Sequence, residues 1–468
     1  MESNNFFKYT LLYIPFILSF LLKDFPHASY FTAWIGSFVI FYLVYSEKIT
    51  NLPKDLPILD QLLRPVFLMH FIFAGYMACT SIFYYLNALG YQYLTKIDSS
   101  IVGDYIVNDI AGCQRYYILG HAALVHGLLF KMRYHSSSNY QIRIKSMSSF
   151  LFQLSIICLP VSFLFEKISF LNQFSVQLQG LSFVSGTIAL AFALKERKNT
   201  LIMLCLLLFT ANFLKATTSG FKEPIFICVL LLGLFLIPVY GKKIIPLFST
   251  ILVSLMIILP TFIGAYRNIS YHGGDQLVAR QQGIDAVLET NYSQNVFQEN
   301  YWIFLTNRLS EIDMFINYTK STPQFVPYYK FSILKQSLEL IVPRFFWSNK
   351  PVTEETVMDR VYKAGIIDPN AAVSAKPAYI VDCFLSYGYI GVWVGLFSMG
   401  FIAQAINNHA ESIFGGYFLG SAVMFAGLFQ IFWRGNSLEF MFNTVFWSFF
   451  TMQVIFYILR AKGNLFRN

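Results

Sequence analysis

A nonapeptide enclosed by two prolines, Pro343-Arg-Phe-Phe-Trp-Ser-Asn-Lys-Pro351, holds two cations and a run of aromatic side chains. Arg344 and Lys350 are side chains that neutralise phosphate, the arginine through paired hydrogen bonds and the lysine as a point charge. Trp347 suits stacking on the face of a sugar, although anchoring a loop at a membrane interface is the commoner use of tryptophan. The motif therefore points to a phosphorylated ligand.

Further cations stand at the ends of apolar runs or in the polar segment around this motif, namely Lys222, Arg267, Arg308, Lys376 and Arg434. Taken singly, each is explained by solvation or by contact with lipid headgroups. That explanation is weaker for Arg344 and Arg434, because an isolated arginine among aromatic residues at membrane depth is costly without a partner. These seven cations are our candidate binding residues.

Several side chains are candidates for a general base. Glu223 lies beside Lys222 at the end of an apolar run, where an ion pair with that lysine is an equal explanation. Asp382 and the Glu311/Asp313 pair are alternatives. His272 is another, since imidazole titrates near neutral pH. The sequence does not choose among them.

Motifs for soluble activated substrates are missing from the sequence. We find no P-loop, HExxH, GxSxG or Cys/His metal cluster, so we expect neither a metal nor another cofactor. An enzyme acting on the outer side of a membrane needs a substrate that is already activated and delivered on a lipid. Such a donor carries a diphosphate, which Arg and Lys would neutralise.

The cysteines and two histidines are explained by helix packing. Six cysteines show no metal or redox spacing, although Cys113 and Cys383 could pair in an oxidising compartment. His121 and His126 are five residues apart, about 140° around a helix, so they do not form a metal-binding pair. An intramembrane histidine also occurs in membrane-bound acyltransferases, which keeps that reaction as an alternative.

The composition is that of an all-α polytopic membrane protein. Apolar residues make up 56% of the chain and charged residues only 13%, and the mean hydropathy is positive. About twelve runs are long enough to cross a bilayer as helices. They centre near Pro15, Gly36, Phe73, Ala123, Cys158, Gly186, Leu208, Leu230, Met256, Val394, Met424 and Ser448.

The basic residues predict the orientation. Alternate loops collect Lys131, Arg133, Arg143, Lys145, Lys195, Arg197, Lys198, Lys242 and Lys243. Because cytoplasmic loops are enriched in Lys and Arg, we expect this side and both termini to be cytoplasmic. The net charge of +9 then reflects topology and anionic lipid, and it does not indicate nucleic-acid binding.

We expect three parts in the chain. Residues 1–264 contain nine transmembrane helices, residues 265–387 form a large extracytoplasmic loop subdomain, and residues 388–468 contain three more helices. In the loop, Trp302 to Thr319 and Phe331 to Ile341 show helical spacing and should lie along the membrane face. Asp368-Pro-Asn should form a turn.

Three segments resemble the Wzy-type O-antigen polymerases. They are the Pro-Arg-x-x-Trp-x-x-Lys-Pro run at 343–351, the segment from Ala371 through Pro377 to Ser386-Tyr-Gly-Tyr-Ile-Gly391, and Trp-Arg-Gly at 433–435. The span count and the late outer loop are similar too, and Arg308 matches a loop arginine of that family. Lys222 stands where many members have arginine, and Ser348 where proline commonly follows the tryptophan.

This resemblance implies a glycosyltransferase of the bacterial inner (plasma) membrane. A hydroxyl of one undecaprenyl-diphosphate-linked repeat unit would attack the anomeric carbon of another glycan, releasing the lipid diphosphate. Arg344, Lys350, Arg434, Lys222 and Arg267 would hold the diphosphate. The implied partners are these lipid-linked glycans and the bilayer, and a chain-length regulator is a further candidate.

Other functions remain open at this stage. An O-antigen ligase would share donor and fold and differ in its acceptor. A lipid-linked oligosaccharide flippase would need a charged cavity between its helices, whereas nearly all charge here falls in expected loops. A non-enzymatic scaffold would tolerate lysine in place of the outer arginines, whereas bidentate phosphate binding would not.

Overall fold

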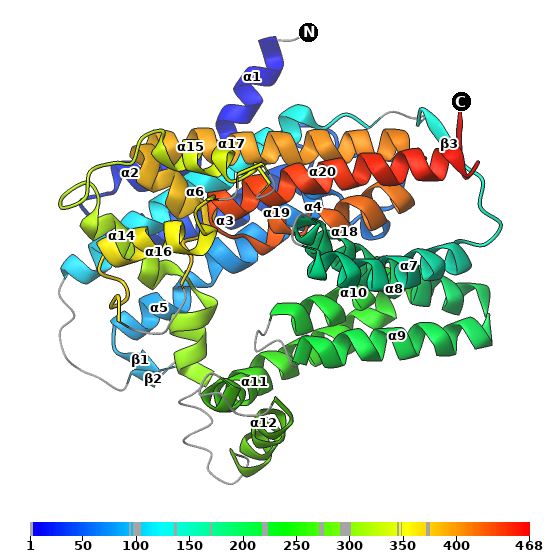
Figure 1. Ribbon diagram of the computed structural model, residues 1–468. Coiled ribbons are helices and arrows are strands. Elements are labelled where there is room, and N and C mark those ends of the chain that lie inside the picture. Colours follow the sequence, from blue (N-terminus) through cyan, green and yellow to red (C-terminus); the bar gives the residue numbers. More distant parts are fainter. Residues whose placement is uncertain are drawn as a thin grey trace.

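Helices form nearly all of the chain in the computed structural model (Figure 1). The structure describes residues 3–92, 95–96, 104–134, 138–168, 171–217, 223–270, 276–290, 301–343, 346–347, 349–370 and 375–468. The long helices run roughly side by side, and the shorter helices of the polar segment cover one end of them (Figure 1). The predicted helical fold class is therefore confirmed.

The first half of the chain contributes helices α1 to α10. They are α1 (Ser3–Thr10), α2 (Ile14–Leu21), α3 (Pro26–Tyr45), α4 (Pro65–Ile72), α5 (Ser81–Ala88), α6 (Asp104–Lys131), α7 (Met147–Lys167), α8 (Ser175–Glu196), α9 (Asn199–Thr217) and α10 (Glu223–Tyr240). A π-helical turn, Phe73–Cys79, joins α4 to α5. Proline opens α3 and α4, where its missing N–H costs nothing.

The second half supplies the polar segment and the C-terminal helices. These are α11 (Ile244–Ser270), α12 (Gln276–Thr290), α14 (Ile312–Ser321), α15 (Ser332–Glu339), α16 (Thr353–Lys363), α17 (Tyr379–Ile413), α18 (Ala426–Leu428), α19 (Ile431–Arg434) and α20 (Leu438–Ala461). Two further π-helical turns occupy Leu305–Leu309 and Phe418–Phe425.

Four short strands form two small ribbons. Strand β1 (Tyr91–Gln92) pairs antiparallel with β2 (Thr95–Lys96). Strand β3 (Tyr140–Ile142) pairs with β4 (Leu465–Arg467), so that Ile142 lies opposite Leu465. The second ribbon ties the C-terminus to the loop between α6 and α7.

Seven helical stretches of the described chain are long and apolar enough to cross a membrane. They are Pro26–Tyr45, Pro65–Ala88, Met147–Lys167, Asn172–Glu196, Gly241–Tyr266, Tyr379–Ile413 and Leu438–Ala461. The predicted number of twelve is not confirmed. Four other predicted spans correspond to shorter apolar helices, Phe7–Leu21, Asn199–Leu214, Ile225–Ile237 and Phe418–Leu428. The remaining one is α6, whose 28 residues include Asp109 and Arg115.

Helices α6 and α17 pack backbone against backbone. A side chain on Gly127 would lie 2.1 Å from the carbonyl oxygen of Phe397, and one on Gly400 would lie 2.2 Å from that of Leu124. Since real side chains do not approach so closely, these glycines set the spacing of the two helices. The main hydrophobic core forms around this pair and includes Leu128, Leu396 and Phe425.

Helix α17 is interrupted near its start. Tyr387 and Gly388 leave the helical conformation, and Gly388 has φ +58° and ψ −132°, a combination that favours glycine. A side chain on Gly391 would meet the carbonyl oxygen of Cys383, so the first two turns fold back along the rest of the helix. The expected end of the outer segment, residue 387, coincides with this kink.

The polar segment forms several of the expected elements. Within the predicted helical stretches lie α14, α15 and the π-helical turn Leu305–Leu309. Leu338 of α15 and Phe331, the residue before this helix, are exposed apolar side chains. A helix that lies along a membrane face is expected to expose such side chains. At the predicted turn, the backbone N–H of Asn370 donates to Asp368 Oδ1 at 2.8 Å.

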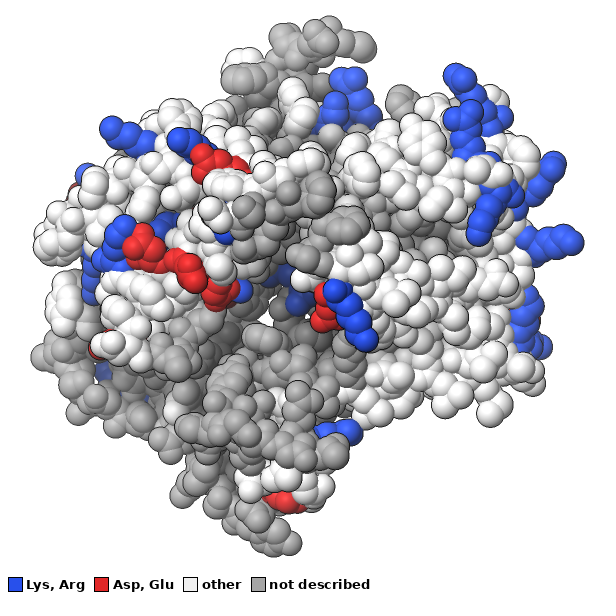
Figure 2. Space-filling model, viewed as in Figure 1, with Lys and Arg blue, Asp and Glu red and all other residues white. Residues whose placement is uncertain are grey.

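Charged side chains are segregated on the molecule. Figure 2 shows Lys and Arg gathered at the end of this face where β3 and the C-terminus lie, whereas cations and carboxylates are mixed at the opposite end. Helices α14 and α16 lie at the mixed end (Figure 1). This is the asymmetry that the loop charges predict, and the assignment of the basic end to the cytoplasm stays a prediction.

Candidate functional site

A buried ion cluster joins three elements at the mixed-charge end. Arg360 of α16 contacts Asp382 of α17 and Glu439 of α20, and the three side chains are 2%, 0% and 0% exposed. Arg360 Nη1 lies 2.5 Å from Glu439 Oε1, and Nη2 lies 2.9 Å from Glu439 Oε2 and 3.1 Å from Asp382 Oδ1. One cation therefore serves two carboxylates.

Helix termini help to hold the two carboxylates. The N–H of Leu438, the first residue of α20, donates to Asp382 Oδ2 at 2.8 Å. Asp382 and Glu439 each lie in the first turn of their own helix. The positive end of a helix dipole and its free N–H groups stabilise anions there.

Helix α16 brings Arg360 into the cluster because it is amphipathic. Val357, Met358 and Val361 are buried on the same side as Arg360, while Glu354 and Glu355 begin the helix. Burial lowers the pKa of the Arg360 guanidinium, but the carboxylates of Asp382 and Glu439 outweigh it and leave that pKa above its ordinary value. Arg360 is therefore a fixed positive charge.

Arg434 lies in the turn next to this cluster. The turn from α19 to α20 passes through Gly435, which has φ +72°, and the N–H of Ser437 is held by Asn436 Oδ1 at 2.8 Å. Arg434 is exposed and its Nη1 is 3.5 Å from Gln430 Oε1. The predicted cation is thus presented at the surface, five residues before the buried Glu439.

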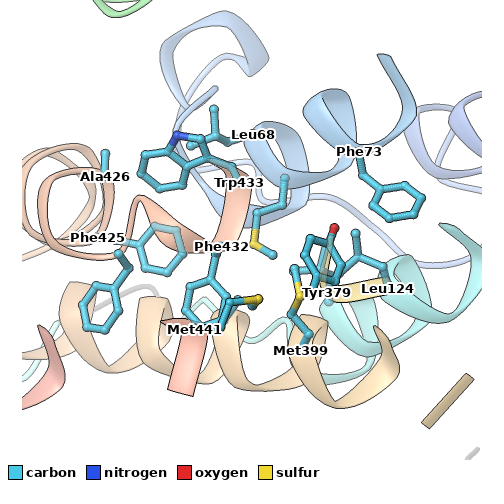
Figure 3. Close-up of a cluster of buried hydrophobic side chains, with 14 of the residues drawn as sticks. Leu68, Phe73, Leu124, Tyr379, Met399, Phe425, Ala426, Phe432, Trp433 and Met441 are labelled. Atoms are coloured by element: carbon cyan, nitrogen blue, oxygen red, sulfur yellow. The ribbon is translucent and has the colours of Figure 1, made fainter. Parts of the chain in front are cut away.

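The residues beside Arg434 anchor this turn in the core. Figure 3 shows Phe432 and Trp433 packed among Phe425, Met441 and Tyr379, side chains that come from α17, α19, α20 and the π-helical turn before α18. Trp433 is buried, so it does not offer its ring to a ligand. Its ring instead anchors the turn in the hydrophobic core.

Lys376 and Lys350 are both engaged by protein groups. Lys376 Nζ lies 2.9 Å from Glu354 Oε2 and 4.3 Å from the centre of the Phe440 ring, so it faces the start of α20. Lys350 Nζ donates to the carbonyl oxygens of Leu340, in a short contact, and of Val342 at 2.9 Å. Lys350 thereby closes the nonapeptide onto the end of α15.

Several predicted residues lie beyond what the structure describes. Lys222, His272 and Arg344 are outside the described residues. Glu223, Arg267 and Arg308 fall in helical positions of α10, α11 and the π-helical turn Leu305–Leu309, and their side chains are not described. The structure therefore brings together Asp382, Lys376 and Arg434 around the start of α20.

The alternative bases lie in other surroundings. Glu311 Oε1 accepts from the hydroxyl of Tyr76 at 2.8 Å, and Asp313 Oδ1 accepts from the hydroxyl of Tyr84 at 3.2 Å. Both are thus engaged with helices of the first half. Among the described residues, no group of three or more His, Cys, Asp or Glu side chains is arranged to hold a metal ion.

The histidines and cysteines occupy packing positions. His126 Nδ1 is 2.9 Å from the hydroxyl of Tyr13, whereas the ring of His121 lies 4.9 Å from that of His70. The two histidines of α6 therefore contact different partners, as their spacing predicts. In the described chain all six cysteines are free thiols, so Cys113 and Cys383 do not pair.

The sequence analysis did not predict two members of the ion cluster, Arg360 and Glu439. Arg360 is surrounded by charges in a segment expected to be solvated, and only its spacing from Val357 and Val361 marks it as a residue of the apolar face. Glu439 follows Asn436-Ser437 and opens an apolar run, a pattern typical of a carboxylate in the first turn of a helix.

A second buried arginine lies at the other end of α17. Arg64, 1% exposed, forms paired hydrogen bonds with Asp55 at 2.6 and 2.7 Å and with Glu411 at 2.8 Å. The ring of Tyr134 covers the guanidinium at 4.0 Å. Hydrogen bonding from Arg64 lowers the pKa of Asp55. All three nitrogens of Arg64 have carboxylate partners, so this cluster is a structural tie.

Comparison with known proteins places the chain in a family. Neither a curated protein nor a solved structure matches it. One family model, described as "Domain of unknown function (DUF8712)", matches residues 14–467, which include every element from α2 to β4. The match therefore extends over every helix after α1 and over both ion clusters. The chain belongs to the DUF8712 family.

Proposed function

We propose that this protein is a membrane glycosyltransferase that joins undecaprenyl-diphosphate-linked repeat units into O-antigen or a related surface polysaccharide. The observation that carries the proposal is the arrangement at the start of α20. Arg434 lies at the surface and Lys376 at half-buried depth there, next to the buried Arg360–Asp382–Glu439 cluster, at the end of the molecule that the loop charges place outside.

This arrangement suits the departure of a diphosphate. In the reaction, an acceptor hydroxyl forms a bond to the anomeric carbon while the bond from that carbon to the diphosphate oxygen breaks. Negative charge then grows on the leaving group, and a cation held in place stabilises it. Arg434 is the described candidate for this role, because its backbone is fixed by the packed Phe432 and Trp433.

The buried carboxylates have a different part in this proposal. The reaction releases the hydroxyl proton, which a base must accept. Asp382 has no exposed surface and is engaged by Arg360 and Leu438, so in this conformation it positions the turn that carries Arg434. Glu223 and His272 stay candidate bases in our proposal.

A gel of surface polysaccharide tests the reaction. The gene is deleted in the source organism and restored as wild type, Arg434→Ala, Arg434→Lys, Arg344→Ala or the control Lys335→Ala, whose lysine is exposed and pairs only weakly with Glu339 at 3.8 Å. We expect deletion to collapse the ladder to single-repeat material, and only wild type and Lys335→Ala to restore it. A bidentate phosphate contact predicts failure of Arg434→Lys as well.

Other outcomes point to the other functions. Long chains that stay on the carrier lipid would identify an O-antigen ligase. Repeat units that accumulate on the inner leaflet would identify a flippase. An unchanged ladder would remove the polysaccharide proposal and leave the acyltransferase alternative. Membrane levels of every variant, measured by immunoblotting, separate lost activity from lost protein.

A further inference from the structure

Arg115 of α6 is a buried cation without a carboxylate partner in the described chain. Its side chain is 9% exposed, and the ion pairs of the described residues do not include it. Its one hydrogen bond runs from Nη1 to Ser29 Oγ at 2.8 Å, and its Nε is buried without an acceptor. Most of its five N–H donors therefore have no protein acceptor in the described chain.

The other two buried arginines show how this chain compensates such a charge with carboxylates. Arg64 has two carboxylates and the face of Tyr134, and Arg360 has two carboxylates. A guanidinium removed from water costs several kcal/mol unless an anion faces it. By that comparison, Arg115 lacks an anion that the described part of the chain does not supply.

The surroundings of Arg115 place the missing anion near a membrane surface. Ser29 lies in the first turn of α3, and the turn between α2 and α3 carries Lys23. Six residues before Arg115, about 9 Å along the helix, Asp109 forms a 3.0 Å ion pair with Lys320 of α14. Helices α2 and α14 lie at the mixed-charge end (Figure 1).

An aromatic group lies beside this position. The ring of Tyr116, the next residue of α6, stacks on Tyr389 at 4.2 Å, and Phe16 and Phe20 of α2 contact Tyr389 at 5.7 and 5.9 Å. Phe20 is exposed, and Lys23 Nζ lies 5.9 Å from its ring. An apolar surface with a cation at its outer edge suits a molecule that has a hydrocarbon chain and an anionic head.

We propose that Arg115 binds the phosphate of a membrane lipid, with Ser29 as a neighbouring hydroxyl and the aromatic group of Phe16, Phe20, Tyr116 and Tyr389 contacting the lipid chain. The phosphate accepts charge-assisted hydrogen bonds from Nε and Nη2. The occupant is a lipid because the aromatic group begins at Tyr116, the residue next to Arg115, and reaches the molecular surface at the exposed Phe20. This inference does not depend on the reaction proposed above.

Lipid titration of the full-length protein in an uncharged maltoside detergent tests the site. The probes are phosphatidylglycerol, a monoglucosyl diacylglycerol with the same acyl chains, and inorganic phosphate, with bound lipid measured by native mass spectrometry. We expect phosphatidylglycerol to bind wild type at least tenfold more tightly than the glycolipid. Arg115→Gln should lose about that factor, because it removes the charge.

Two further variants keep the test decisive. Arg115→Lys retains the charge but not the fork, so it should bind phosphatidylglycerol more weakly than wild type and still prefer it to the glycolipid. Lys335→Gln, an exposed cation of α15, should bind like wild type. Equal phosphatidylglycerol affinity in wild type and Arg115→Gln would overturn the proposal, as would equal binding of the two lipids. Displacement of phosphatidylglycerol by equimolar inorganic phosphate would show a free-phosphate site instead.

Discussion

Replacing Arg360 with methionine should destabilise the protein far more than neutralising one of its partners. Arg360→Met removes the single cation and leaves Asp382 and Glu439 buried together, both without exposed surface. Loss of one partner from a buried pair costs about 3–5 kcal/mol. Glu439→Gln keeps an acceptor for Arg360 and leaves one cation facing one carboxylate. We therefore expect it to lower the free energy of unfolding by only about 1–2 kcal/mol.

The free energy of unfolding, measured by SDS titration in mixed micelles, compares these variants. Combining Arg360→Met with Glu439→Gln should cost less than the sum of the single effects, because the double variant buries only one uncompensated carboxylate. Asp382 would then still accept from Leu438 N–H. Equal costs for the two single variants, or an Arg360→Met cost below about 1 kcal/mol, would refute the reasoning that charge imbalance dominates this cluster.

Three other predictions concern packing, pH and the kink. Gly400→Val should cost about 1–3 kcal/mol or more, because it forces α6 away from α17, whereas Gly264→Ala, with open space around it, should be neutral or stabilising in the same titration. The contribution of Asp55 to stability is present above its unfolded pKa of about 4 and is lost as pH falls through its lower folded pKa. The stability gap between wild type and Asp55→Asn should therefore narrow below about pH 4 in melting curves, and a constant gap would contradict it. Gly388→Ala should lower the free energy of unfolding by about 1–3 kcal/mol, because it places a side chain at φ +58°. A variant that melts at the same temperature as wild type would show that the kink tolerates a side chain.

The sequence predicts the helices of the membrane region well and the polar segment in part. Apolar runs identify where helices form, and each predicted centre from Gly36 to Ser448 falls within a helical stretch. The predicted number of twelve spans is not confirmed, since seven stretches of the described chain meet the length and hydropathy of a span. Among the other predicted spans, the described apolar run Ile225–Ile237 is part of α10, and α6 is long but carries charge.

The candidate site was found through those members that stand in apolar stretches of the sequence. Arg434 and Asp382 stand in apolar surroundings, where a charge is conspicuous. Arg360 and Arg64 lie in polar stretches, so only three-dimensional packing shows that they are buried. Arg115 was missed for a related reason, because one arginine in a long apolar helix does not reveal whether an acid faces it. Pairings between residues hundreds of positions apart are set by helix packing, which spacing along the chain does not encode.

The tie between Arg64 and Glu411 has a consequence for how the protein is made. These partners are separated by 347 residues, so of the two carboxylates that pair with Arg64 only Asp55 exists until almost the whole chain has been synthesised. A nascent chain that stops before α17 therefore carries an arginine whose second partner does not yet exist. A chain that terminates between Arg64 and Glu411 therefore lacks this tie. Its folded state should be less stable, which would expose the truncated chain to membrane proteases.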